Sequence, residues 1–302
     1  MSSTSKGRYS RRRFLQLSGI ALLSTQIQFP LFTVSRQKVY QGRALEAAPV
    51  HLEKDLLSLT SRQLWPDSIV PIYESDEHWY QVPDGYVQRH LIQPMTPYEP
   101  GINQGSSVPF WAEVAAPVAP VRQWCAADAP LITRIGHGGV ARVIDWLPGD
   151  GEDRIWYGLE TGDGNLLGWT QAVYWHQVNE DEPPAATHPT LHIDQRAQRL
   201  TAYEQDQIVL QALISSGVEI VPGRYSVEER RFSGVPLPIA EYRRTFYGIP
   251  WYIRFGKDYV LSGAYWHNRF GAPTLGPAVQ APPFLARWLY YWLGDAGTVT
   301  IT

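Results

Sequence analysis

The sequence predicts a mainly β protein. It contains 12 Trp and 17 Tyr, and aromatic side chains favour strands. It also contains 25 Gly and 24 Pro, both of which disfavour the interior of a helix. Short apolar stretches separated by turn-forming residues recur along its length, as they do in β-hairpins. A chain of 302 residues is long enough for two or three modules of this kind.

The composition excludes several classes of function. Charged residues make up only 18% of the chain and the net charge is −3, so no basic surface for nucleic acid is expected. Cys125 is the single cysteine, which rules out an intramolecular disulfide and a Cys-based zinc site. The histidines are scattered, and the sequence contains no Gly-rich phosphate loop. We therefore expect no metal and no cofactor.

Residues 1–48 are typical of an export signal and its leader. Consecutive arginines in SRRRFLQ (10–16) precede a modestly apolar stretch that ends near Phe32. This order resembles a twin-arginine signal, which implies transfer by the twin-arginine export machinery to the outside of the cytoplasmic membrane. A membrane anchor formed by the uncleaved signal, or a basic N-terminal helix, is the alternative.

Two segments, 49–98 and 107–179, repeat one plan of strands and turns. In the first, the run Pro83-Asp84-Gly85 separates two apolar stretches and predicts a hairpin. Its landmarks, WY followed by GYVQ, recur in the second segment as WY followed by GWTQ. Both segments resemble the bacterial SH3-like modules of cell-envelope proteins. This resemblance implies two small barrels.

Residues 180–190 are acidic and then rich in Pro and Ala, which is typical of a linker. The pattern beyond it changes. Residues 191–217 predict successive strands, and residues 250–266 predict a strand pair joined through Gly256-Lys257-Asp258. Residues 297–302 predict a closing strand. The segment after the linker is therefore expected to be a third, β-rich domain that covers residues 191–302.

One substantial helix is predicted over residues 282–294. Leu285, Trp288, Leu289 and Trp292 recur at the spacing of one helical face. Two prolines at the beginning suit the first turn of a helix, and Gly294 is suited to ending it.

The region 191–302 resembles the catalytic domain of the L,D-transpeptidases, also called the YkuD domain. The resemblance rests on AYEQDQIVLQALISSG (202–217), VPGRY (221–225), YGIPWYIRF (247–255) and YWHNRFGAP (265–273), followed by the aromatic helix. These features cover essentially the whole domain in the family's order. Members of this family attack a peptidoglycan tetrapeptide with a Cys thiolate and pass the acyl group to the amine of a neighbouring stem.

The family's reactive residues lie in the pattern His-Gly-(Thr/Ala)-Tyr-Trp-His-Asn-x-Phe-Gly-x-Pro-x-Ser-His-Gly-Cys-Val-Asn. Aligned without a gap, its reactive His, Ser, second His, Cys and last Asn fall on Ser262, Leu275, Gly276, Ala278 and Gln280. The family's residues are kept at Gly263, Tyr265, Trp266, His267, Asn268, Phe270, Gly271, Pro273 and Val279. The chain therefore resembles a degenerate member that lacks the catalytic Cys and His.

The replaced positions predict that catalysis is lost. Acyl transfer needs an activated nucleophile, and a thiol becomes a thiolate beside an imidazole. Ala278 offers only a methyl group, and Gly276 removes the imidazole that would take the thiol proton. Pro277 has no backbone N–H, so an oxyanion-binding donor at this turn is expected to be lost as well.

Three residues are candidates for a relocated nucleophile. Ser262 and His267 are five residues apart, and pairing them needs a bend because odd separations on a strand face opposite sides. Thr274 has no evident base beside it. Cys125 lies in the preceding segment and is interpreted as a small packed side chain. If one of them acts, the protein is an active L,D-transpeptidase or a peptidoglycan peptide hydrolase.

A candidate ligand cleft is the remaining prediction for this domain. Aromatic faces with polar tips suit stacking on glycan or stem peptides, whereas core packing is the other interpretation of the same rings. The cleft residues are Tyr247, Trp251, Tyr265, Trp266, His267 and Asn268.

Taken together, these features predict an exported cell-envelope protein located in the cell wall or periplasm. We expect a catalytically inactive homologue that binds peptidoglycan stem peptides or other envelope proteins. A purely protein-binding structural module is a further hypothesis.

Overall fold

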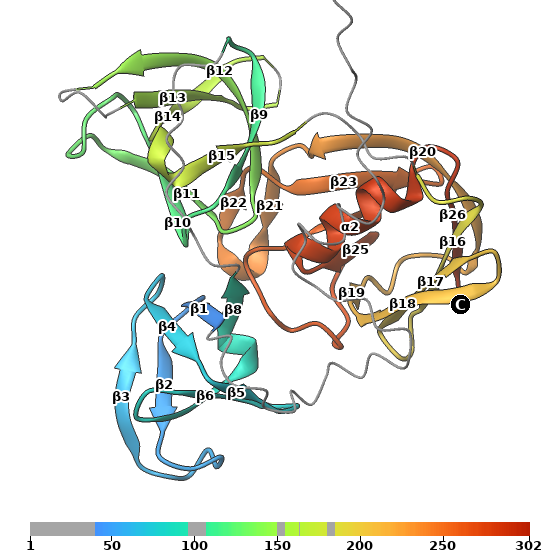
Figure 1. Ribbon diagram of the computed structural model, residues 1–302, viewed down its shortest axis with the longest axis horizontal. Helices are drawn as coiled ribbons and strands as arrows, with labels where there is room; N and C mark the ends of the chain where they lie inside the picture. The colour runs from blue at the N-terminus through green and yellow to red at the C-terminus, as the bar shows by residue number, and fades with distance from the viewer. Residues whose placement is uncertain (1–39, 96–106, 150–154, 163, 180–184) are drawn as a thin grey trace, which may run out of the picture.

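The computed structural model describes residues 40–95, 107–149, 155–162, 164–179 and 185–302, and it is mainly β, as predicted (Figure 1). Three units follow one another, coloured blue, green, and yellow to red in Figure 1. Residues 1–39 of the predicted signal and leader (1–48) and residues 180–184 of the predicted linker lie outside the described residues. Within the described part, no helix is long and apolar enough to cross a membrane.

The first unit contains two small sheets. Its elements are β1 (Tyr40–Ala44), β2 (Ala48–His51), β3 (Thr60–Leu64), β4 (Ile69–Ile72), β5 (Glu74–Ser75), β6 (Trp79–Val82), β7 (Gly85–Gln88), the 3-10 helix η1 (Arg89–Leu91) and β8 (Ile92–Met95). The strand orders are β4-β1-β8 and β3-β2-β7-β6-β5. Because β1 pairs with both β4 and β8, the unit begins inside the range 1–48 that the sequence assigns to the signal and leader.

The predicted hairpin turn at residues 83–85 is confirmed. Val82 lies opposite Gly85, and Asp84 and Gly85 have φ values of 70° and 146°. A Cβ atom at Gly85 would lie 2.0 Å from the carbonyl oxygen of His51. Glycine is therefore required for the close approach of two backbones as well as for the turn.

The second unit is one seven-stranded sheet with the order β11-β10-β14-β13-β12-β9-β15. Its elements are β9 (Phe110–Val114), β10 (Val118–Arg122), β11 (Leu131–Gly136), β12 (Val140–Pro148), β13 (Ile155–Glu160), β14 (Leu166–Gln171), the 3-10 helix η2 (Ala172–Tyr174) and β15 (Trp175–Gln177). Apolar side chains of these strands, such as Val121, Tyr157 and Trp175, are fully buried.

The predicted repeat is confirmed as a repeat of structure. Trp79 lies opposite Gln88 in β6 and β7, and Trp156 lies opposite Gln171 in β13 and β14. A 3-10 helix and a short strand follow each hairpin. An Ala-Pro-Val run lies in both β2 and β10, and in each strand the pairing register shifts directly after that run. Their classification as SH3-like modules stays a prediction.

The third unit contains a nine-stranded sheet with the order β18-β17-β16-β26-β20-β23-β24-β25-β19. Its elements are β16 (Pro189–Asp194), β17 (Arg199–Glu204), β18 (Gln207–Leu213), β19 (Ser215–Ser216), β20 (Gly223–Ser233), β21 (Leu237–Ile239), the 3-10 helix η3 (Ala240–Tyr242), β22 (Arg244–Phe246), β23 (Pro250–Phe255), β24 (Tyr259–Gly263), β25 (Ala278–Ala281), α2 (Pro283–Leu293) and β26 (Thr298–Ile301). The predicted strand pair is confirmed, since Phe255 lies opposite Tyr259. The predicted closing strand β26 pairs with β16 and β20.

The predicted helix is confirmed as α2, which lies against the sheet (Figure 1). Pro282 precedes it and Gly294, with φ of 55°, ends it. Its apolar face buries Leu285, Leu289 and Leu293. The helix packs against β23, β24 and β16, so both halves of the sheet contribute to one core.

Candidate functional site

Three of the five positions that the gapless alignment sets against the family's reactive residues lie on two neighbouring parallel strands. In β24 and β25, Val260 lies opposite Ala278 and Ser262 lies opposite Gln280. Because side chains alternate along a strand, Ala278 and Gln280 project from the same face, and Ser262 joins them there. Gln280 also lies opposite Ser215 of β19. The structure therefore brings three of the five replaced positions together.

The other two replaced positions lie in the turn before β25. Leu275 is 84% exposed, and Gly276 has a φ of 81°, which favours glycine. A Cβ atom at Gly217 would lie 1.7 Å from the carbonyl oxygen of Gly276, so the turn packs backbone against backbone. The N–H of Thr274 donates to the carbonyl oxygen of Ser216 over 3.3 Å in the same contact. Thr274 is thus a turn residue.

His267 is buried and both of its ring nitrogens are engaged. The backbone N–H of Arg269 donates to Nδ1 over 3.2 Å, so Nε2 carries the proton and donates to Oε1 of Gln280 over 2.7 Å. Burial lowers the pKa of His267, and the charge of Arg269 lowers it further, against the hydrogen bond to Gln280. The imidazole is neutral and has no free nitrogen to accept a proton from Ser262.

Most of the predicted cleft residues are core residues in this structure. Trp251 is 0% exposed, Tyr265 is 1% exposed and Trp266 is 5% exposed. The Trp266 ring lies 4.9 Å from the ring of Phe246, between centroids. For these three rings the geometry is that of the packing interpretation. Tyr247 is half-buried, and its carbonyl oxygen accepts a hydrogen bond from the hydroxyl of Tyr265 over 2.6 Å.

The loop after β24 attaches the third unit to the first. The side-chain amide of Asn268 donates to the carbonyl oxygens of Arg89 and Ile92 over 2.9 and 2.7 Å. The Arg43 guanidinium donates to the carbonyl oxygen of Tyr265 over 2.6 Å, and burial lowers the pKa of Arg43 to about 10. Asn268, predicted for the cleft, is therefore a contact between units.

The same loop shares a core with the second unit. Phe246, Tyr265 and Trp266 belong to one apolar cluster with residues of the second sheet such as Ile135 and Tyr157. The aromatic rings that the sequence assigns to a cleft are thus covered from outside their own domain.

An ion pair joins the second unit to α2. The Arg287 guanidinium lies 3.0 Å from Oε2 of Glu113, and the His176 imidazole lies 3.3 Å from the same oxygen. Burial alone would raise the pKa of Glu113, but the hydrogen bond with His176 and the charge of Arg287 outweigh it and hold the pKa below its usual range. Glu113 is therefore ionised at the interface.

Sequence reasoning missed these contacts between units. Arg43 and Glu113 stand at equivalent places in β1 and β9, opposite Gln93 and His176 in the strands that follow the two 3-10 helices. Each is a buried charge among apolar strand residues. That feature, together with the repeat, is the signal that could have identified them.

The structure provides no activation for Cys125. Its thiol is partly buried in the second unit, and burial and the nearby Asp145 carboxylate raise its pKa. A raised pKa disfavours the thiolate that acts as a nucleophile. Among the described residues, no group of three His, Cys, Asp or Glu side chains is placed to hold a metal ion.

Comparison with known proteins finds several solved L,D-transpeptidases among the similar structures. The L,D-transpeptidase of Enterococcus faecium is 12% identical over 39% of this chain and 50% of its own, with a TM-score of 0.34. That of Stackebrandtia nassauensis is 17% identical over 41% of this chain and 60% of its own, with a TM-score of 0.31. That of Mycobacterium smegmatis is 14% identical over 63% of this chain and 99% of its own, with a TM-score of 0.33.

The chain spans only 50% and 60% of the length of the first two of these structures. No protein-family model and no curated protein matches the chain. All three TM-scores lie below 0.5.

Proposed function

We propose that this protein is an exported, catalytically inactive homologue of the L,D-transpeptidases that binds peptidoglycan or envelope proteins outside the cytoplasmic membrane. One observation carries the proposal. Ala278, at the nucleophile position, shares a strand face with Ser262 and Gln280, and the nearby imidazole of His267 is held by Gln280. The scaffold of the motif is retained while its reactive groups are replaced.

The replacements remove each chemical step of acyl transfer. A methyl group cannot form an acyl intermediate, and neither Gly276 nor the engaged His267 can accept the proton of a nucleophile. Loss of nucleophile and base together removes several orders of magnitude in rate. Binding needs none of these groups, so it is the function that survives their loss.

The proposal includes the organisation of the chain. A twin-arginine signal and leader, assigned by the sequence to 1–48 but ending before β1 at Tyr40, would direct export. Two SH3-like modules (to residue 98, and 107–179) would follow, then a linker (180–190, of which β16 takes the last two residues) and the L,D-transpeptidase-like domain (191–302). The contacts made by Asn268 and by Glu113 support modules that are packed against one another and act together, as opposed to independent modules joined by linkers.

The test has two parts. The purified chain is incubated with tetrapeptide-containing muropeptides beside an active family member, and the products are followed by mass spectrometry. It is also sedimented with purified peptidoglycan. We expect retention on peptidoglycan and no cross-linked, exchanged or hydrolysed product.

Two outcomes would count against the proposal. Turnover that disappears on changing Ser262, Thr274 or Cys125 to Ala would establish an enzyme with a relocated nucleophile. Absence of retention, together with a co-purifying protein partner, would favour a structural module that binds only protein.

A further inference from the structure

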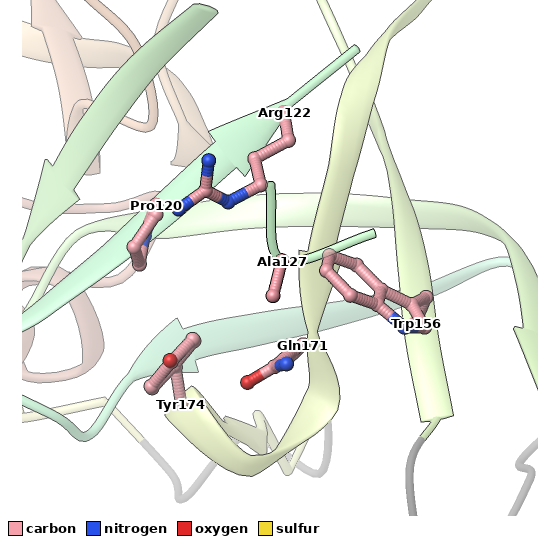
Figure 2. A pocket seen from close by; sticks show the side chains of 6 residues that line it. All are labelled: Pro120, Arg122, Ala127, Trp156, Gln171 and Tyr174. Carbon is pink, nitrogen blue, oxygen red and sulfur yellow. The ribbon is translucent and has the colours of Figure 1, made fainter. Parts of the chain in front are cut away.

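The second unit contains a small hollow that is separate from the family-pattern positions. It is lined by Pro120, Arg122, Ala127, Trp156, Gln171 and Tyr174. Figure 2 shows Pro120 and Arg122 on one side of it, Gln171 and Tyr174 opposite, and Trp156 at its edge. The lining comes from β10, β13, β14 and η2, so a rigid sheet positions most of it.

The polar side chains of this hollow make few hydrogen bonds with the described part of the protein. The Arg122 guanidinium donates to the carbonyl oxygen of Ala129 over 2.6 Å, and no carboxylate of the described residues pairs with it. Within the same described part, the Gln171 amide and the Tyr174 hydroxyl have no hydrogen-bond partner in the protein. A guanidinium with further donors, an amide and a hydroxyl line this one hollow, together with two aromatic rings.

The repeat supplies an internal comparison. In the first unit, Trp79 and Gln88 are paired as Trp156 and Gln171 are in the second. Each unit has a Gly followed by an aromatic residue in its hairpin, Tyr86 in the first unit and Trp169 in the second. His51 lies opposite Tyr86, and Arg122 lies opposite Trp169.

The two units differ at this residue in their packing. The His51 ring is buried, lies 5.5 Å from the Trp79 ring and is directed at the carbonyl oxygen of Ser58. Leu91 stands where the second unit has Tyr174. In the first unit the ring at this position therefore packs against Trp79, whereas the second unit has a guanidinium there and a hydroxyl in its 3-10 helix.

Size and chemistry together limit the ligand. The hollow has a volume of about 50 Å³, which is enough for a carboxylate with one methyl-sized group. A guanidinium binds a carboxylate with two parallel hydrogen bonds, and aromatic rings suit a small apolar group.

We propose that this hollow binds the terminal carboxylate of a peptide whose last residue has a methyl-sized side chain. Arg122 takes the carboxylate, Gln171 and Tyr174 donate to it or to the preceding amide, and Trp156 contacts the side chain. That the peptide comes from a peptidoglycan stem rests on the proposed function. The recognition of a carboxylate by Arg122 does not depend on it.

The experiment measures peptide binding to the whole chain by saturation-transfer NMR. The probes are N-acetyl-D-alanyl-D-alanine, its C-terminal amide, N-acetyl-D-alanyl-D-phenylalanine and N-acetyl-L-alanyl-L-alanine. We expect the amide and the phenylalanine peptide to bind at least about tenfold more weakly than the first peptide, because one loses the charged hydrogen bonds and the other does not fit. Preference between the D and L peptides separates a wall stem from the C-terminus of a protein.

Variants localise the binding. Arg122→Gln should weaken it at least about tenfold, and Gln171→Ala should weaken it while Gln88→Ala, the same change in the first unit, should not. Equal binding of carboxylate and amide by the unaltered chain would overturn the proposal, as would no binding at any soluble concentration or full binding by a folded Arg122→Gln chain. If the peptide binds and peptidoglycan does not retain the chain, the pocket stands and the proposed function fails.

Discussion

The Nε2–H group of His267 donates to Oε1 of Gln280 over 2.7 Å, between two buried side chains. In the gapless alignment with the L,D-transpeptidase pattern, the histidine matches a residue of the pattern and Gln280 falls on its last Asn. Because the backbone of Arg269 occupies the other ring nitrogen, the imidazole acts as a fixed structural bridge between the loop and β25. Several measurable consequences follow from this and from the contacts between units.

Stability is expected to fall as the pH is lowered through 6.5, the ordinary pKa of His267. The folded-state pKa is lowered by burial, so the unfolded chain binds a proton first and the free energy of unfolding decreases below that pH. His137, whose pKa burial also lowers, acts in the same direction. Urea unfolding between about pH 7.5 and about pH 5.5 measures the slope and stays above the range in which carboxylates titrate.

His267→Gln is the informative variant for that slope. Gln keeps a donor for Gln280 but does not titrate, so the slope should become shallower without vanishing, since His137 remains. An unchanged slope in His267→Gln would show that the imidazole does not govern this pH dependence.

Asn268→Ala is expected to lower the free energy of unfolding by about 1–3 kcal/mol, because two carbonyl oxygens of the first unit lose their donor. Asn268→Asp should cost more, because a carboxylate would face the carbonyl oxygens of Arg89 and Ile92. Urea unfolding monitors both variants. An Asp variant as stable as the Ala variant would mean that these two hydrogen bonds do not hold the units together.

The Glu113–Arg287 pair should respond asymmetrically. Arg287→Met leaves a buried carboxylate with only His176 and should cost about 3 kcal/mol or more. Glu113→Gln leaves an arginine whose side chain is 39% exposed and can reach water, so it should cost about 1 kcal/mol. Thermal unfolding gives the comparison. Arg254→Met, which removes partly exposed ion pairs with Glu228 and Glu229, is the control and should cost less than Arg287→Met. Equal costs for the two interface variants would contradict the asymmetry.

Carbapenem antibiotics, which acylate the Cys of the family, should form no adduct with this chain. Ala278→Cys should also remain slow, because Gly276 supplies no imidazole and His267 has no free nitrogen. Intact-mass analysis beside an active family member checks both. A stable adduct on the third unit of the unaltered chain would overturn the assignment of Ala278 to the nucleophile position.

Local sequence pattern was sufficient for the elements. The spacing of Leu285 and Leu289 between prolines and Gly294 predicted α2, and the Pro83–Gly85 turn predicted its hairpin, because each depends on residues close in the chain. The repeat of Trp79 and Gln88 by Trp156 and Gln171 was also visible, since a duplicated fold keeps its landmark residues in order.

Only the tertiary structure decided which elements contact one another and which side chains they bury. The hydrogen bond from Arg43 to the carbonyl oxygen of Tyr265 joins residues 222 positions apart, and neither local sequence pattern predicts it. The same holds for Trp251 and Tyr265, whose aromatic pattern suits a cleft or a core equally. The burial of an aromatic ring depends on side chains that pack on it from distant strands. The hollow beside Trp156 likewise depends on residues of other strands, such as Arg122 of β10. The sequence determined the elements and their repeat, because these are properties of residue identity and short-range spacing, whereas the packing between units is a property of surfaces that form only after folding.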